Sequence, residues 1–136
     1  MSNQPNEHLT HADLRQFTGT TAWYRHRMTA KVVFTDGVKY LAEKGGAYWL
    51  IDAIVSHLLT PAMRRAIAND GRLSTLQFWR LEVAADQTAV LTCRADDGVT
   101  PAITQKIPST DFPLDHVDIW CGFDGERWTL YLPSEH

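Results

Sequence analysis

The hydrophobic period of this chain changes at Gly71. Before Gly71, apolar residues recur three and four positions apart, as on one face of a helix. After it, apolar and polar residues alternate, as in a half-buried strand. The 136 residues suffice for one core. We therefore predict a single α+β domain over residues 10–136, with N-terminal helices packed on one face of a sheet. Residues 1–9 are predicted to form a flexible N-terminus.

The helical half centres on Thr35–His57, the most apolar stretch of the chain. Asp36 is predicted to cap a helix, because its carboxylate can accept free N–H groups of the first turn. Gly45-Gly46 ends that helix. The next helix is apolar on most sides and is predicted to be buried, with Asp52 and Ser56 as its unexplained polar pair. Two further helices are predicted to start at Thr10 and Pro61.

Five segments after Gly71 alternate as strands do. They are Leu76–Val83, Thr88–Arg94, Ile103–Ile107, Val117–Phe123 and Trp128–Leu132. Strands joined by short turns pair in sequence, and Asp124-Gly125 is a strong hairpin signal. We therefore predict a five-stranded antiparallel meander in the order 1-2-3-4-5. Lys31–Phe34 is interpreted as a brief strand or an extended arm.

Three aromatic residues, Phe78, Trp120 and Tyr131, are predicted to face away from the helices. Large apolar side chains on an outer face indicate either an exposed patch or a covered one. An exposed patch would bind a protein partner or a second copy of the chain as a homodimer. The alternative cover is the N-terminal arm.

The cluster Trp23, Tyr24, Arg25, His26 and Arg27 joins two aromatic rings to cationic side chains. Such a cluster can stack on a nucleobase. It can equally anchor the segment, with its rings on the core and its cations in water. On the first interpretation these five residues are candidates for partner binding, and on the second they are structural.

Charge is divided unequally along the chain. Residues 1–72 carry nine Lys/Arg against six Asp/Glu, whereas residues 73–136 carry four against ten. The acidic half would repel phosphates and attract a basic partner, or it would simply keep the sheet in solution. Asp96, Asp97 and Asp111 are its candidate contact residues.

The sequence predicts no catalytic residue, no cofactor and no metal site. Cys93 and Cys121 fall on inward strand faces and are interpreted as core residues. Only His8 and His11 have metal-ligand spacing, and they fall in or near the flexible N-terminus. The chain lacks a Gly-x-Ser-x-Gly elbow, a signal peptide and an apolar run long enough to cross a bilayer. We therefore expect a cytoplasmic protein without a membrane partner.

Several blocks of the sequence together resemble a family of small bacterial proteins of unknown function found on plasmids, phages and integrative elements. The blocks are Phe17–Gly19, Trp23–His26, Thr35–Glu43, Gly46–Asp52, Gln77–Trp79, Ala89–Cys93, Thr110–Leu114 and Leu132–Glu135. The chain departs from the family at Asp96-Asp97-Gly98, where a longer turn rich in Asn and Gly is expected. The resemblance implies a mobile-element setting and supplies no catalytic residues.

These observations predict a non-catalytic, protein-binding accessory protein of a mobile genetic element. An inhibitor of a host defence system, of the anti-CRISPR or anti-restriction type, fits that description. One alternative is a small enzyme using His26 or His116 with Asp36 or Asp111. Another is nucleic-acid binding through basic residues of the first half, namely Arg25, Arg27, Lys31, Arg64 and Arg65.

Overall fold

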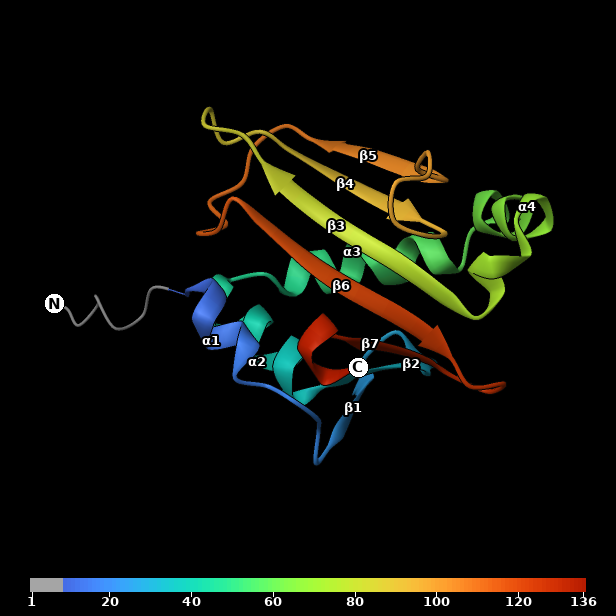
Figure 1. The fold of residues 1–136 in the computed structure, drawn as a ribbon, viewed down its shortest axis with the longest axis horizontal. Helices are drawn as coiled ribbons and strands as arrows, with labels where there is room; N and C mark the ends of the chain where they lie inside the picture. The colour runs from blue at the N-terminus through green and yellow to red at the C-terminus, as the bar shows by residue number, and fades with distance from the viewer. Residues whose placement is uncertain (1–8) are drawn as a thin grey trace, which may run out of the picture.

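Seven strands form one mixed sheet in the computed structural model, which describes residues 9–136 (Figure 1). In chain order the strands are β1 (Trp23–His26), β2 (Thr29–Thr35), β3 (Leu76–Val83), β4 (Ala89–Arg94), β5 (Ile103–Ile107), β6 (His116–Phe123) and β7 (Trp128–Tyr131). Their order across the sheet is β1-β2-β7-β6-β3-β4-β5. All neighbours are antiparallel except β2 and β7, which are parallel. The predicted five-stranded antiparallel meander is therefore wrong.

The connection between β5 and β6 explains part of this difference. The strand after β5 does not pair with it; β6 pairs with β3 instead, and β5 is left at an edge. Phe112 and Leu114 in the connection are 3% and 8% exposed. The Phe112 ring also lies against Gly45, where an added Cβ would come within 2.9 Å of it. The loop thus returns along the core, and its buried side chains override the tendency of consecutive strands to pair.

The N-terminal half supplies two strands that the meander lacked. β1 pairs with β2 in a hairpin, and Val32–Phe34 pairs in parallel with Trp128–Leu130. Of the two interpretations offered for Lys31–Phe34, the strand is the one that the structure shows. The hairpin was missed because its turn, at Arg27-Met28, contains none of the residues that usually mark a turn.

The helices are α1 (His11–Arg15), α2 (Asp36–Gly45), α3 (Tyr48–Leu58) and α4 (Pro61–Asn69), with single 3₁₀ turns η2 (Gly71–Ser74) and η3 (Pro133–Glu135). Figure 1 shows α3 crossing behind β3 and β6. Side chains on that face of the sheet are buried, including Leu81, Leu91 and Ile119, each 1% exposed. Within residues 9–136, no helix has the length and apolarity needed to span a membrane.

The helix ends follow local sequence signals with one shift. Thr35, rather than Asp36, is the N-cap of α2, and its hydroxyl accepts the Val38 N–H at 3.4 Å. Gly46 ends α2 in the left-handed conformation with φ 61°, as the glycine pair predicts. Pro61 occupies the first turn of α4, also as predicted.

Asp36 holds the segment before β1 instead of capping α2. Its carboxylate accepts the N–H of Thr21 at 2.9 Å and the hydroxyl of Tyr24 at 2.8 Å. These hydrogen bonds, chiefly that from the Thr21 backbone, lower the Asp36 pKa from 3.8 to about 2.

Asp36→Asn is expected to lower the thermal unfolding midpoint at pH 7 and to lose this effect in acid. Because the folded pKa is depressed, the carboxylate stabilises the fold above about pH 3.8 and ceases to do so as the pH falls towards 2. Midpoints of both proteins measured from pH 7 to pH 2 should therefore converge below pH 4. Asp97→Asn, at an exposed carboxylate, is the control and should change the midpoint little. A constant gap between Asp36→Asn and wild type would contradict the assignment.

Trp79 lies at the centre of the core, on β3 between β4 and β6. It is 1% exposed, and its ring stacks on His57 of α3 with centroids 5.6 Å apart. Its indole N–H donates to the side-chain oxygen of Gln77 at 3.0 Å, and the Gln77 amide donates to the Leu73 carbonyl at 3.0 Å. A completely buried glutamine is therefore satisfied at both ends of its side chain.

The two cysteines are buried core residues, as predicted. Cys93 on β4 and Cys121 on β6 are free and separated by β3. Burial raises the pKa of the Cys93 thiol to about 12, and that of Cys121 well above its usual value. Neither thiol is thus poised as a nucleophile near neutral pH.

The turn after β7 closes onto the start of α2. Glu135 Oε1 accepts the Thr35 hydroxyl at 2.7 Å and the Leu132 N–H at 2.9 Å. Its other oxygen accepts the Gly37 N–H at 3.1 Å. The carboxylate therefore supplies negative charge and an acceptor at the positive end of a helix about 100 positions away in sequence.

Candidate functional site

The face of the sheet opposite α3 carries a row of three aromatic side chains. Phe78, Trp120 and Tyr131 lie directly opposite one another on β3, β6 and β7. The ring centroids of Phe78 and Trp120 are 5.1 Å apart, and those of Trp120 and Tyr131 are 6.2 Å apart, both edge to face. The His136 ring lies 5.3 Å from Trp120, and its Nδ1 is 2.9 Å from the Tyr131 hydroxyl. The row is partly exposed. Of the N-terminal arm predicted as its alternative cover, residues 1–8 lie outside the described residues.

A groove of about 370 Å³ lies beside this aromatic row. Its lining residues are Phe78, Arg80, Arg94, Asp96, Asp97, Asp118, Trp120 and Pro133. The Arg80 guanidinium donates to both oxygens of Asp118, at 3.1 and 3.0 Å, and to Glu82 at 3.0 Å. One of the two arginines in the groove is therefore already neutralised by its neighbours.

The rim of the groove is acidic. Asp96 and Asp97 are exposed beyond the end of β4, and Asp96 approaches Arg72 only to 3.8 Å. Among residues 9–136, the Asp97 carboxylate forms no ion pair and accepts no hydrogen bond. Arg94 is held by the Val99 carbonyl at 3.0 Å. The groove is thus lined by two aromatic rings, by Arg80 in an ion pair, by Arg94 held only by neutral acceptors, and by the unpaired carboxylate of Asp97.

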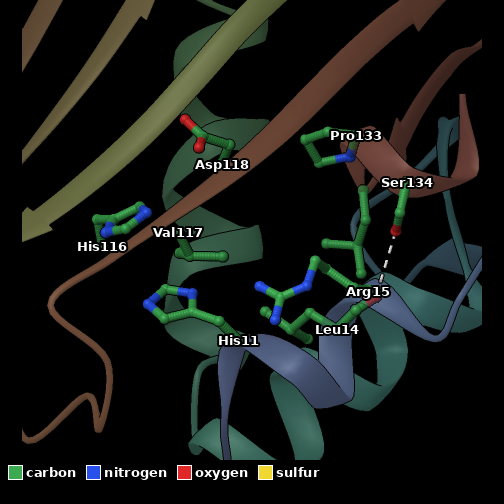
Figure 2. A pocket seen from close by; sticks show the side chains of 9 residues that line it. His11, Leu14, Arg15, His116, Val117, Asp118, Pro133 and Ser134 are labelled. Atoms are coloured by element: carbon green, nitrogen blue, oxygen red, sulfur yellow. Dashed lines mark hydrogen bonds between the residues drawn. The ribbon is translucent and has the colours of Figure 1, made fainter.

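A second cluster lies where α1 meets the start of β6. Asp115 Oδ1 lies 3.0 Å from His11 Nε2 and 3.0 Å from His116 Nδ1, and the two imidazole rings stack with centroids 4.5 Å apart. Figure 2 shows the two rings facing each other from the two elements, beside a pocket of about 140 Å³. The hydrogen bond from His11 is the main cause that lowers the Asp115 pKa. Arg15 and Ser134 also line this pocket.

The model of a protein family of unknown function, DUF6876, matches residues 8–136. The chain belongs to the DUF6876 family. No curated protein and no solved structure matches this DUF6876 chain. The predicted resemblance to a family of unknown function is confirmed, whereas its mobile-element setting stays a prediction.

In the DUF6876 chain, the aromatic and basic cluster of β1 is divided between two environments. Trp23 is 61% exposed, and Arg25 and Arg27 also face solvent. Tyr24 is half-buried and donates to Asp36, and His26 is 4% exposed. β1 is one of the two edge strands, and β2 separates it from β7, the nearest strand of the aromatic row, so this cluster does not join the row.

His26 is held in a specific hydrogen-bonding arrangement. Its Nδ1 accepts the Met28 N–H at 3.2 Å, which leaves the proton on Nε2 for donation to Asp52 Oδ1 at 2.8 Å. Arg27 donates to the other oxygen of Asp52 at 3.0 Å. Asp52, unexplained in the sequence, therefore ties α3 to the β1–β2 hairpin. The Ser56 hydroxyl donates to the Asp52 backbone carbonyl, as is common within helices.

The histidine–aspartate pairs suggested for an enzyme are not the ones that form. His26 pairs with Asp52 rather than Asp36, and His116 pairs with Asp115 rather than Asp111. Asp111 is exposed in the β5–β6 connection and is absent from the groove lining. Asp115 was missed because sequence spacing offered no reason to bring His11 to it.

The groove residues could have been found more completely from the strand alternation. Arg80 is two positions after Phe78, and Asp118 two before Trp120, so each shares a face with a predicted aromatic residue. What was missing was the pairing of β3 with β6, which places Arg80 opposite Asp118.

Proposed function

We propose that this protein is a non-catalytic binding protein, and that the groove on the open face of its sheet takes a basic segment of a partner protein. The observation that carries the proposal is the row of Phe78, Trp120 and Tyr131, aligned on adjacent strands and bordered by acidic side chains. Tryptophan, tyrosine and arginine are the residues that contribute most to protein interfaces.

The charges of the groove favour a lysine or arginine side chain as its occupant. Arg80 is already paired with Asp118 and Glu82, and the remaining charged residues of the lining, Arg94 against Asp96 and Asp97, leave an excess of one negative charge. A cation laid over Trp120 would gain a cation–π contact while its charge faced the acidic rim. The excess of Asp/Glu in residues 73–136 would also attract a basic surface from a distance.

The resemblance to mobile-element proteins supports a more specific proposal for the partner. Nucleases that act on foreign DNA present basic surfaces, so a defence effector of the CRISPR or restriction type would offer the required chemistry. We place the protein among accessory proteins that inhibit such effectors in the cytoplasm.

The groove is expected to bind a hexa-arginine peptide and to reject a hexa-glutamate peptide. In titrations followed by NMR, the Trp120 indole N–H signal should show the largest shift, because Trp120 lines the groove. Trp120→Ala should weaken binding by at least about 30-fold, as for a central interface residue. Asp97→Lys should weaken it by roughly 5-fold, as expected for a charge at a solvated rim.

The matched control is Glu126→Lys, which makes the same charge reversal in the exposed β6–β7 turn. It should retain binding within about 2-fold, because it is not in the groove. Equal losses in Asp97→Lys and Glu126→Lys would show attraction by net charge alone and would overturn the assignment to the groove. The same variants should then separate true partners from background in a pull-down from the native host.

Two other modes of binding have distinct outcomes in these experiments. A second copy in the groove would give a concentration-dependent dimer in sedimentation that Trp120→Ala abolishes. Nucleic-acid binding through Arg25, Arg27, Lys31, Arg64 and Arg65 would give a salt-dependent shift of labelled DNA that Trp120→Ala retains. Either result without peptide binding would contradict the proposed partner.

A further inference from the structure

We propose that His11, Asp115 and His116 form a zinc-binding site that joins α1 to the start of β6. One ligand atom from each residue lies within 4.8 Å of the other two. Both imidazole nitrogens point at the same carboxylate oxygen, which is 3.0 Å from each. A divalent cation between these atoms would take the place of the two hydrogen bonds, with each neutral imidazole carrying its proton on the ring nitrogen that does not bind the metal.

The ligand types select the kind of metal. Two imidazole nitrogens and one carboxylate oxygen suit Zn²⁺, whereas Mg²⁺ and Ca²⁺ prefer sites made entirely of oxygen. Tetrahedral zinc with bonds of about 2.0–2.2 Å separates its ligand atoms by roughly 3.3–3.5 Å. The two nitrogen–oxygen distances of 3.0 Å are already close to this value. The Asp115 side chain is 78% exposed, so it has room for the small rotation required.

The backbone on both sides holds the ligands in place without the metal. Thr10 and Asp13 form a reciprocal capping box at the start of α1, and the Ser134 hydroxyl donates to the Leu14 carbonyl at 3.2 Å. On the other side, the Asp115 carbonyl accepts the Val83 N–H at 2.8 Å. The two backbone segments that carry the ligands are therefore already in place, so metal binding has to order little beyond the ligand side chains.

Three protein ligands leave one position of a tetrahedral zinc ion open. That position suits a water molecule, since the cluster borders the pocket that Arg15 and Ser134 also line (Figure 2). Asp118 and Pro133 line both this pocket and the groove, so the two sites are neighbours. The zinc proposal nevertheless stands without the proposed function, because metal binding can be measured without a partner.

Zinc titration of the full chain by calorimetry should give one site per molecule. His11→Ala and His116→Ala should each weaken zinc binding by at least about 100-fold. Even residues that only hydrogen-bond to metal ligands commonly change metal affinity by about 10- to 100-fold when they are replaced. Asp115→Asn should also weaken it. Cobalt(II) in place of zinc should show the visible absorption of a four-coordinate site in wild type and lose it in His116→Ala. Saturating zinc should raise the thermal midpoint of wild type but not of His116→Ala.

His136→Ala is the matched control, because His136 is exposed and lies outside the cluster. Its zinc affinity should equal that of wild type. His8→Ala distinguishes the present site from the His8–His11 pair that sequence spacing suggests. Loss of binding in His8→Ala with full binding in His116→Ala would overturn the proposal. So would equal zinc affinities of wild type and His116→Ala.

Discussion

Replacing Trp79 by alanine is expected to lower the free energy of unfolding by about 3–5 kcal/mol. The indole is 1% exposed and fills the space between the sheet and α3, where it stacks on His57. Its removal leaves a cavity that the paired strands β4 and β6 cannot collapse to fill. Urea unfolding followed by circular dichroism measures the loss as a lower midpoint with an unchanged slope.

Trp79→Phe separates the volume of the indole from its hydrogen bond. Phenylalanine keeps most of the apolar contact but leaves the Gln77 oxygen without its indole donor, so a smaller loss of about 1–2 kcal/mol is expected. If alanine and phenylalanine were equally destabilising, packing would not be the main contribution of Trp79.

The second large effect is expected at Glu135. Glu135→Ala removes the acceptor of the Thr35 hydroxyl and of the Gly37 and Leu132 N–H groups. Hydrogen bonds to an ionised group contribute more than neutral ones, and here they also neutralise the start of α2. We expect a loss of about 2–4 kcal/mol in the free energy of unfolding.

Glu126→Ala is the control for this change, because it removes a glutamate from an exposed turn and should cost less than about 0.5 kcal/mol. Glu135→Gln retains two acceptor lone pairs and should lose about half as much as Glu135→Ala. Equal stabilities of the Glu135→Ala and Glu126→Ala variants would rule out the proposed role of Glu135 at α2.

The elements of this fold were predictable where their signals are local. Alternation located all five C-terminal strands within a few residues, and Gly46 and Pro61 marked helix ends correctly. The pairing of β2 with β7 was not predictable, because Val32 and Trp128 carry no complementary local signal. The strand order failed for the same reason, since the burial of Phe112 and Leu114 is a tertiary effect.

The candidate sites were likewise predictable only where they follow from local sequence signals. The outward faces of Phe78, Trp120 and Tyr131 follow from the two-residue period of a strand, and the structure aligns them. The contact between His11 and Asp115 joins residues 104 positions apart and requires the docking of α1. Clusters assembled from distant segments leave no spacing in the sequence by which to recognise them.

The parallel pairing of β2 with β7 also has a consequence for how the chain is made. The β1–β2 hairpin leaves the ribosome early, but its neighbour β7 is synthesised 96 positions later. At 5–20 residues per second the nascent hairpin waits roughly 5–20 s with one strand edge unpaired. During that interval the edge of β2 that later pairs with β7 has no partner strand, and it can associate with other chains. Completion of the fold therefore waits for the last strand.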